Sequence, residues 1–275
     1  MEQSGQPQGL YGVVGYPLSQ SLSPLIHNWG LTKHRIPACY LAWSIPPHLL
    51  PSFMLAIRTL PISGASVTLP HKQTVIPYLD RLTNTVLAIG AVNTLYWENG
   101  ELWGENTDLA GFMAPLAPLS GELGSALVVG AGGAALACLE GLRRLGVKDL
   151  AVTARDDSKL RALCSSQGAI AVPWSQREEH RADLLINATP LGMKGKAEGV
   201  PPLAPHPART PLVYDLIYNP VRTALLQQAK QQGCRTISGL DMFVHQAAEQ
   251  FWIWTGRALD SQKLWDLLQE HLDPG

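Results

Sequence analysis

Lys72 is the residue of this sequence best suited to proton transfer. It follows Thr68-Leu69-Pro70-His71, and the pattern predicts a helix that begins at Pro70 and carries Lys72 in its first turn. The positive end of a helix disfavours a nearby cation, so this place favours the neutral amine, which can take up a proton near neutral pH. Most lysines are solvated surface residues, so the interpretation depends on whether the fold brings Thr68 and Asp108 to Lys72. Asp108 starts a predicted helix, where the usual interpretation of an aspartate is a helix cap.

Further polar side chains lie where predicted strands end. They are Ser21, Ser23, Thr68, Lys72, Asn93, Asn106 and Asp108. Ligands of α/β folds bind at strand ends, so these residues predict a site for a small polar molecule. Ser23, which precedes Pro24, is predicted to cap a helix that runs to about His34. Ser21 and Ser23 together suit a carboxylate at that helix N-terminus.

A glycine-rich turn predicts a dinucleotide site in the second half of the chain. The predicted strand Ser125–Val129 is followed by Gly130-Ala131-Gly132-Gly133-Ala134-Ala135 and then by a helix. In this Gly-x-Gly-x-x-Ala pattern, Gly130 permits the tight turn and Gly132 lets the backbone approach the pyrophosphate. Ala135 is small enough to pack against the strand. The alternative is a glycine-rich turn that binds nothing.

The end of the next predicted strand, Leu150–Thr153, bears on the choice between NAD and NADP. An NAD site is expected to have an acid there, which bonds the ribose hydroxyl. This chain has Ala154 and then Arg155, whose guanidinium suits a 2′-phosphate, with Lys159 one helical turn further on. Asp156 and Asp157 would repel that phosphate, and a solvated surface arginine is an equally good interpretation of Arg155. The balance favours NADP.

Strands alternate with helices along the chain, which predicts an α/β fold. In the first half the predicted strands are Gly9–Val14, Tyr40–Trp43, Ile62–Leu69 and Gly90–Trp97, the last with a hairpin turn at Glu98–Glu101 and a return to Glu105. In the second half they include Leu184–Asn187 and Leu212–Leu216, separated by a predicted loop from Gly192 to Thr210. Two helices, Leu240–Thr255 and Ser261–Leu272, end the chain. The boundary between two domains is expected between Asp108 and Gly124.

Composition excludes several classes of protein. The 275 residues suffice for two small domains, and a net charge of −1 gives no footprint for nucleic acid. The polar segment Met1–Gln8 does not resemble a signal peptide, and no apolar run is long enough for a membrane span, so the expected location is cytoplasmic. The four cysteines are scattered, and His27, His71 and His245 have no ligand spacing, so no metal is expected. There is no Gly-x-Ser-x-Gly for serine-hydrolase chemistry.

Taken together, the chain resembles the shikimate dehydrogenase family from about Tyr11 to Gly256. The segments that carry the resemblance occur in the family's order: Ser19-Gln20-Ser21-Leu22-Ser23-Pro24, Val67-Thr68-Leu69-Pro70-His71-Lys72, Gly90-Ala91-Val92-Asn93-Thr94, Asn106-Thr107-Asp108, Gly130-Ala131-Gly132-Gly133-Ala134-Ala135, Asn187-Ala188-Thr189-Pro190-Leu191-Gly192-Met193, Tyr214-Asp215-Leu216-Ile217-Tyr218-Asn219-Pro220 and Gly239-Leu240-Asp241-Met242-Phe243-Val244-His245-Gln246.

The resemblance implies reversible reduction of 3-dehydroshikimate to shikimate by NADPH, on the route to chorismate and the aromatic amino acids. It implies that Lys72 and Asp108 form the catalytic pair and that Ser21 and Ser23 hold the substrate carboxylate. The other implied substrate residues are Thr68, Asn93, Tyr218 and Gln246. The implied cofactor residues are Gly130, Ala131, Gly132, Gly133, Ala134, Arg155, Lys159, Leu216 and Gly239.

The implied architecture has a substrate domain at residues 1–108 and a Rossmann-type NADP domain at residues 109–239. C-terminal helices at residues 240–275 would pack back on the substrate domain. The resemblance implies either a monomer or a homodimer, and of these the homodimer is favoured. The chain departs from the family in three places: Ala154-Arg155-Asp156 replaces a frequent Asn-Arg-Thr, Ser66-Val67-Thr68 replaces Asn-Val-Thr, and Leu109 replaces a glycine. The first of these departures bears on NADP preference, since only the central arginine of that segment is retained.

Two other functions stay open at this point. One is a relative that prefers quinate, or that accepts both acids with NAD, because quinate differs from shikimate by a ring hydroxyl. The other is a non-catalytic module that senses a dinucleotide or shikimate. The presence of both Lys72 and Asp108 argues against the sensing module, which would need neither residue for chemistry.

Overall fold

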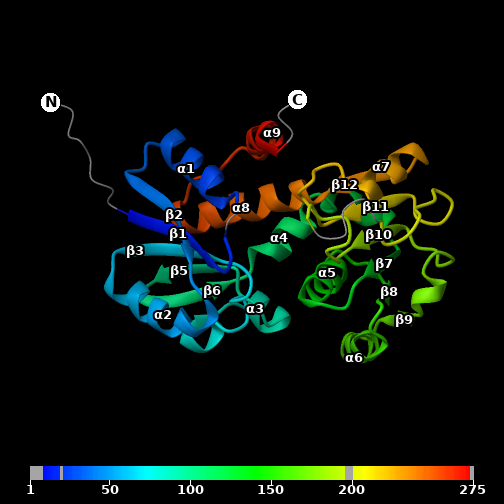
Figure 1. Cartoon of the computed structure of the whole chain (residues 1–275), viewed down its shortest axis with the longest axis horizontal. Helices are drawn as coiled ribbons and strands as arrows, with labels where there is room; N and C mark the ends of the chain where they lie inside the picture. Colours follow the sequence, from blue (N-terminus) through cyan, green and yellow to red (C-terminus); the bar gives the residue numbers. More distant parts are fainter. Residues whose placement is uncertain (1–8, 19–20, 196–200, 273–275) are drawn as a thin grey trace. The chain divides into compact units, whose positions relative to one another are not determined.

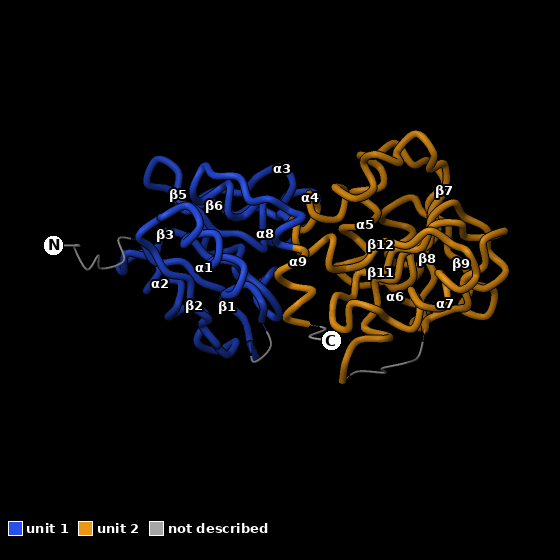
Figure 2. Tube along the Cα trace, turned by 90° about the horizontal axis from the view of Figure 1, so that it is seen from above, with its two compact units in different colours: residues 1–107, 246–264 blue, residues 108–245, 265–275 orange. Residues whose placement is uncertain are grey.

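The computed structural model describes residues 9–18, 21–195 and 201–272, so Ser19 and Gln20 of the first family segment, the segment Met1–Gln8 and part of the predicted loop from Gly192 lie outside it. The chain divides into two compact units (Figure 2). Unit 1 comprises Met1–Thr107 and Gln246–Leu264, and unit 2 comprises Asp108–His245 and Trp265–Gly275. The chain therefore leaves unit 1 at the start of one helix and returns to it in the middle of another.

Unit 1 is built on a six-stranded mixed sheet of order β2-β1-β3-β5-β6-β4. Its strands are β1 (Gly9–Gly15), β2 (Ala38–Ser44), β3 (Ile62–Val67), β4 (Arg81–Leu82), β5 (Thr94–Glu98) and β6 (Glu101–Glu105). Strand β1 is parallel to β2 and β3, whereas β3 and β6 run antiparallel to β5. The predicted hairpin between β5 and β6 is confirmed, with Asn99 and Gly100 at φ values of 52° and 80°, as a tight hairpin turn requires.

Helices cover both faces of this sheet (Figure 1). Helices α2 (Leu50–Thr59) and α3 (Asn84–Ile89) lie on one face, where Phe53, Met54 and Ile57 pack against buried strand residues. Short 3₁₀ turns, η1 (Pro47–Leu49) and η2 (Ile76–Tyr78), precede them. Helix α3 is absent from the sequence prediction, although Thr83 caps it by accepting from the Val86 amide and Gly90 ends it at a φ of 71°.

The opposite face is covered by α1 (Ser23–Lys33) and the second half of α8 (Gly239–Thr255). Two glycines permit the close approach of α8. A Cβ on Gly64 of β3 would lie 2.5 Å from the indole nitrogen of Trp254, and a Cβ on Gly30 of α1 would lie 2.8 Å from the Phe251 ring. The Trp254 indole also donates to the Leu95 carbonyl at 2.9 Å, which fixes the helix against the sheet.

Unit 2 is built on a six-stranded parallel sheet of order β12-β11-β10-β7-β8-β9. Its strands are β7 (Ser125–Val129), β8 (Asp149–Thr153), β9 (Ile170–Val172), β10 (Leu184–Asn187), β11 (Leu212–Asp215) and β12 (Arg235–Ser238). Strand order reverses between β7 and β10, as in doubly wound dinucleotide-binding folds, which bind ligands at that switch point. The predicted Rossmann-type sheet is thus confirmed.

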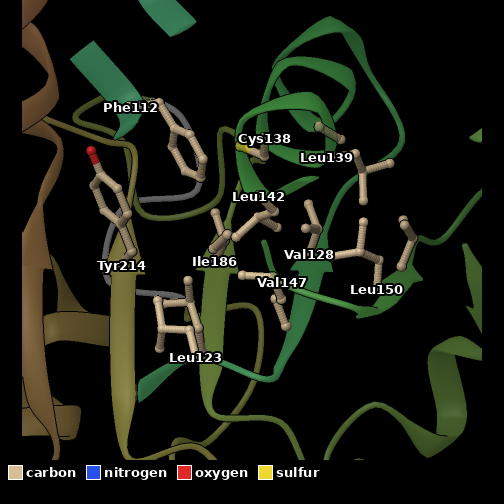
Figure 3. Close-up of a cluster of buried hydrophobic side chains, with 14 of the residues drawn as sticks. Phe112, Leu123, Val128, Cys138, Leu139, Leu142, Val147, Leu150, Ile186 and Tyr214 are labelled. Carbon is tan, nitrogen blue, oxygen red and sulfur yellow. The ribbon is translucent and has the colours of Figure 1, made fainter. Parts of the chain in front are cut away.

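Alternate residues of these strands face two different cores, which is why helices lie on both faces. Figure 3 shows the larger core, in which Leu139 and Leu142 of α5 (Gly133–Arg144) pack over Val128 and Ile186. On this face the ring of Phe112, from α4 (Thr107–Met113), stacks on Tyr214 with centroids 5.4 Å apart. The remaining helices and turns of the unit are η3 (Ala117–Glu122), α6 (Asp157–Gln167), η4 (Trp174–Gln176), α7 (Ala224–Gln231) and α9 (Ser261–Leu272), and α9 begins in unit 1.

The helix predicted from Pro70 is wrong. Residues 69–75 form successive turns that lead into η2. In a helix the Lys72 carbonyl would accept from Ile76, but here it accepts from the Val92 amide at 2.7 Å, and Ile76 donates to Gln73 instead. Pro77 has no N–H with which to continue a helical pattern. A partner distant in sequence therefore decides the local structure.

The predicted cap at Ser23 is also wrong. Leu22 is the residue before the first turn of α1, and Ser23 is already helical. The Ser23 side chain is buried and hydrogen-bonds Tyr40 of β2 rather than the helix backbone. The predicted end of α1 agrees with the structure, since His34 follows the last helical residue.

Candidate active site and cofactor site

Residues predicted for the substrate site gather at one end of the unit 1 sheet. Thr68 directly follows β3, and Asn93 directly precedes β5, which pairs with β3 through Ser66 and Thr94. The Val67 amide donates to the Asn93 carbonyl at 2.7 Å. Strand β6 ends at Glu105 beside Thr94, so the segment that leads to α4 starts at the same place. Residues that are far apart in the sequence thus meet at one end of the sheet, where these strands begin or finish.

The Asn93 side chain is buried and its amide orientation is fixed by its partners. Its Oδ1 accepts from the Thr107 backbone amide at 2.7 Å and from the Thr94 hydroxyl at 2.7 Å. Its Nδ2 donates to Thr107 Oγ1 at 3.0 Å and reaches Gln246 Oε1 at 3.5 Å. Because Thr107 begins α4, Asn93 also sets where that helix starts, and Asp108 is the next residue.

Lys72 lies in the turn between β3 and η2 and is half-buried. Its carbonyl holds the Val92 amide, which places the lysine backbone next to Asn93. The preceding residue, His71, is fully buried, and its Nε2 donates to the Ile45 carbonyl at 2.7 Å. Because residues 69–75 form turns and no helix, the predicted electrostatic field of a helix N-terminus is absent at Lys72. The residue is held in place by the hydrogen bond of its own carbonyl with Val92 and by the side-chain hydrogen bond of the preceding His71.

The residues predicted to hold a carboxylate lie at the start of α1. The Ser21 amide donates to the Leu18 carbonyl at 3.2 Å. The residue before the helix is Leu22, which has no polar side-chain atom to cap the helix amides, and such amides favour anions. Ser23 hydrogen-bonds Tyr40, so its hydroxyl is shared with that buried phenol.

The two remaining substrate residues of the prediction belong to different units. Gln246 is buried in α8, in the part of the helix that packs on unit 1. Tyr218 belongs to unit 2, follows β11 and stacks on Phe243 with ring centroids 4.7 Å apart and an interplanar angle of 12°. Burial raises the pKa of the Tyr218 phenol, so this hydroxyl stays protonated and can donate a hydrogen bond.

The turn after β7 fits the diphosphate of a dinucleotide. Gly130 has a φ of 119°, and a Cβ there would lie 3.0 Å from the Ala188 carbonyl of the neighbouring β10 loop. A Cβ on Gly132 or Gly133 would meet no heavy atom within 4 Å in the described part of the chain, so the turn is open above the N-terminus of α5. Gly132 caps that helix without a side chain, which leaves its first amides to an anion.

Leu216 and Gly239 are held together in unit 2. A Cβ on Gly239 would overlap the Leu216 carbonyl, so glycine is required where the loop after β11 meets the start of α8. Asp241 fixes this helix start by accepting from the Ser238 amide at 2.9 Å and from the Ser238 hydroxyl at 3.0 Å. The two predicted cofactor residues are therefore neighbours, at the same end of the sheet as Gly130.

The acids beside Arg155 are engaged with α6. Asp156 caps the helix by accepting from the Lys159 amide at 3.1 Å, accepts from the Ser158 hydroxyl at 2.8 Å, and lies 3.6 Å from Lys159 Nζ. These contacts lower the pKa of Asp156, the backbone hydrogen bond from Lys159 most of all. Asp157 pairs with Arg161 at 2.8 Å. Each carboxylate thus has a cation beside it, which weakens its repulsion of a phosphate bound at the exposed Arg155.

Sequence reasoning gave no role to Asp215, which is fully buried at the end of β11. It accepts from Asn187 Nδ2 at 2.9 Å, from the Ile217 amide at 3.2 Å and from the Thr223 hydroxyl at 2.6 Å. Burial nevertheless raises its pKa to about 6. The sequence feature that could have indicated Asp215 is a single acidic residue at the end of an otherwise apolar strand. Asp215 ties the end of β10 to the loop after β11 and to the start of α7.

Two features are absent from the described ranges 9–18, 21–195 and 201–272. These ranges contain no group of three or more His, Cys, Asp or Glu residues that could hold a metal ion. None of the helices in these ranges is long and apolar enough to cross a membrane. His27 is buried against Tyr40, with ring centroids 4.5 Å apart, and has a packing role.

Known proteins resemble this chain over almost its whole length. The family model described as the shikimate dehydrogenase substrate binding domain matches residues 13–95, and that of the shikimate 5′-dehydrogenase C-terminal domain matches residues 239–269. A relative from Maridesulfovibrio salexigens named shikimate dehydrogenase (NADP(+)) is 46% identical over 268 residues, which are 97% of this chain and 98% of the relative. The chain belongs to the shikimate dehydrogenase family.

Solved structures of related enzymes align with almost the whole chain. Shikimate 5-dehydrogenase from Thermus thermophilus, in complex with NADP(H) and shikimate, aligns with a TM-score of 0.84 at 34% identity and covers 96% of this chain and 99% of its own. Quinate dehydrogenase from Corynebacterium glutamicum, in complex with NAD, aligns with a TM-score of 0.86 at 28% identity and covers 95% of this chain and 98% of its own. The predicted family and the predicted α/β fold are confirmed.

Proposed function

We propose that this chain catalyses the reversible reduction of 3-dehydroshikimate to shikimate by NADPH, on the route to chorismate and the aromatic amino acids. The observation that carries the proposal is the gathering of Thr68, Asn93 and the start of α4 at one sheet end, with Lys72 anchored beside them. The 46% identity to a relative named shikimate dehydrogenase (NADP(+)) supports the reaction and the cofactor.

Unit 1 is the part that we propose binds the acid. Ser21 and Ser23 hold the carboxylate at the start of α1, where the helix amides favour an anion. Thr68, Asn93 and Gln246 bond the ring hydroxyls, and the contacts of Asn93 with Thr107 and Gln246 give its amide a fixed direction. Tyr218 of unit 2 is a further proposed substrate residue on the resemblance alone, and its protonated phenol can donate a hydrogen bond.

Lys72 and Asp108 are the proposed catalytic residues. During oxidation of shikimate, the Lys72 amine takes the proton of the reacting hydroxyl, and it returns that proton during reduction. The Asp108 carboxylate accepts a hydrogen bond from the same substrate and orients the hydroxyl for this transfer. Bound NADP supplies the acceptor for the hydride that leaves the ring carbon. Lys72 therefore needs a fixed backbone, which Val92 and His71 give it.

Unit 2 is the part that we propose binds NADP. The amides of Gly130, Ala131, Gly132, Gly133 and Ala134 hold the diphosphate over the open turn above α5. Arg155 and Lys159 pair with the 2′-phosphate, since both lie where the second strand of the sheet ends. Leu216 and Gly239 line the nicotinamide end of the site, held together by the tight contact between them.

We also propose a homodimer in the cytoplasm. Strand β2 is the edge of the unit 1 sheet, and Leu41 on it is 45% exposed, so this edge offers both backbone groups and an apolar contact to a second copy. Sedimentation velocity tests the assembly. The free thiols Cys39, Cys138, Cys164 and Cys234 suit a reducing compartment.

The proposed reaction is tested with shikimate and NADP, with quinate in a parallel assay. Formation of NADPH with shikimate, at a kcat/KM well above that with quinate, is the expected result. A higher kcat/KM with quinate would reassign the substrate. Binding of shikimate without any reduction of either nicotinamide cofactor would contradict the enzyme and favour the sensing module.

A further inference from the structure

A buried chain of hydrogen bonds runs through unit 1 to Asn93. The Tyr40 hydroxyl donates to Ser66 Oγ at 2.7 Å, and Ser66 Oγ donates to Gln250 Oε1 at 2.8 Å. Gln250 Nε2 donates to the Thr94 hydroxyl at 2.9 Å, and the Thr94 hydroxyl donates to Asn93 Oδ1 at 2.7 Å. Each donor points the same way, from Tyr40 towards Asn93, and such chains polarise and strengthen their bonds.

Gln250 joins two parts of Asn93 to this chain. Its Nε2 also donates to the Asn93 carbonyl at 2.9 Å, so a single side chain holds both the backbone and, through Thr94, the side chain of Asn93. It is 2% exposed and lies one helical turn after Gln246 on the same buried face of α8. Both glutamines therefore contact Asn93 from one helix. Gln246 contacts the side-chain Nδ2 of Asn93, and Gln250 contacts the backbone carbonyl of Asn93.

The surroundings of the chain hold it in one arrangement. The His27 ring stacks on Tyr40, and burial lowers the pKa of His27 to about 3, so the ring is neutral. Ser23 also hydrogen-bonds Tyr40, which links the start of α1 to the same chain. A purely packing role would be met by an apolar side chain, and buried amides are costly unless their bonds are made. We therefore interpret the hydrogen-bond network as a device that orients Asn93, the residue at its end.

We propose that Gln250 is a positioning residue for the acid substrate, which orients the Asn93 amide while Tyr40 and Ser66 hold Gln250 itself. The inference rests on the proposed function, in which Asn93 bonds the substrate ring. Asn93 keeps its Nδ2 directed at Thr107 Oγ1 and Gln246 Oε1 only while its Oδ1 faces Thr94 and the Thr107 amide. A ring hydroxyl would replace the longer of the two Nδ2 contacts, the one to Gln246 at 3.5 Å. Loss of the Gln250 bonds removes the hold on the Asn93 carbonyl and on the Thr94 hydroxyl. Thr107 is then the main remaining anchor of the Asn93 amide, so its orientation is less strictly fixed and substrate binding weakens, while the cofactor turn of unit 2 keeps its own contacts.

The test is Gln250→Met, which keeps the length of the side chain and removes both donors and the acceptor. Kinetic constants are measured with shikimate and NADP for the wild type, Q250M, Asn93→Ala and the double variant, with melting temperatures for all four. We expect Q250M to raise the KM for shikimate about tenfold and to leave the KM for NADP within about twofold. In the Asn93→Ala background, Q250M should change the KM for shikimate by less than about twofold, because the group it orients is gone.

Gln228→Leu, at an exposed glutamine of α7, is the matched control and should change neither KM. If Q250M fails to fold, Tyr40→Phe removes only the first donor of the chain and should raise the KM for shikimate about threefold. A Q250M enzyme with a lower melting temperature but an unchanged KM for shikimate would overturn the inference, as would an equal rise in both backgrounds. A wild type that does not oxidise shikimate would instead overturn the proposed function.

Discussion

The backbone amide of Thr107 donates a hydrogen bond of 2.7 Å to the side-chain oxygen of Asn93. This bond joins the residue before β5 to the first residue of α4, which are close because β5 and β6 pair directly. Asp108 follows Thr107, so the same asparagine that we assign to the substrate also sets the start of the segment that carries the proposed catalytic carboxylate.

Substitution of Asn93 should therefore affect both binding and turnover. Asn93→Ala removes the acceptor of the Thr107 amide and leaves that buried group unpaired, which costs about 1–3 kcal/mol of stability. We expect the KM for shikimate to rise at least about tenfold and kcat to fall, with the KM for NADP unchanged. Asn84→Ala, at an exposed position of α3, is the control. An N93A enzyme with wild-type kcat/KM for shikimate would remove Asn93 from the site.

Substitution of Lys72 separates chemistry from binding. Lys72→Ala removes the amine that exchanges the substrate proton, so kcat should fall by roughly 10²–10⁴-fold. Shikimate should still bind, because Ser21, Ser23 and Asn93 are untouched, and titration calorimetry measures this directly. Lys148→Ala, at an exposed lysine of unit 2, is the control. Unchanged turnover of K72A would show that Lys72 carries no proton.

Cofactor preference should respond to charge at the start of α6. Arg155→Gln removes one partner of the 2′-phosphate, so the KM for NADP should rise roughly 10- to 100-fold while that for NAD is unchanged. Asp156→Asn keeps an N-cap side chain and removes a negative charge, so it should lower the KM for NADP several-fold.

Asp157→Asn provides the comparison for Asp156, because Asp157 is neutralised by Arg161 at 2.8 Å. It should shift the KM for NADP less than Asp156→Asn does. Equal rises in the KM for NADP and for NAD on Arg155→Gln would show that Arg155 acts outside the 2′-phosphate site.

Stability should depend on pH through Asp215. Its folded-state pKa of about 6 lies above the ordinary value of 3.8, so the folded state binds the proton more tightly than the unfolded state does. The associated stability is fully present below about pH 4 and is lost as the pH rises through 6, by an amount on the order of 3 kcal/mol. Other groups superimpose their own pH dependence, so the measured quantity is the difference between variants.

Asp215→Asn keeps the shape of the side chain and cannot ionise. Urea denaturation at about pH 4.5 and at about pH 7 should show D215N gaining stability relative to the wild type at the higher pH. Asp149→Asn, at an exposed aspartate of β8, should show no such gain. A D215N protein that loses as much stability as the wild type between these pH values would contradict the assignment.

The sequence predicts the local structure of the glycine-rich turn in unit 2 well because its determinants are local. A buried strand, a Gly-x-Gly-x-x-Ala turn and a helix follow one another along a short stretch of chain, and the helix C-terminus at Gly146 has the positive φ that its glycine indicates. The sequence alone presents Asp156 as an obstacle to NADP. Its pairing with Lys159 depends on where α6 begins, because only a helix that starts directly after Asp156 brings the two side chains together.

Unit 1 is predicted less well because contacts distant in sequence decide its local structure. The turn at Lys72 forms because Val92 takes the lysine carbonyl, and no local pattern indicates that partner. A serine before a proline predicts a cap at Ser23, whereas Tyr40 competes for the hydroxyl. The buried position of Gln250 could have been predicted from the sequence. It is a second glutamine, one helical turn after Gln246, on the apolar face that carries Ala247 and Phe251.

The central claim is hydride transfer between a nicotinamide and one ring carbon of shikimate, and isotope transfer measures it most directly. The wild-type protein is incubated with 3-dehydroshikimate and NADPH that carries deuterium at the transferable position of one face, and then of the other. The account predicts that one of the two cofactors yields shikimate with a single deuterium on the carbon of the new hydroxyl. The account would be contradicted if neither labelled cofactor were consumed, or if the shikimate formed with each of the two cofactors carried no deuterium.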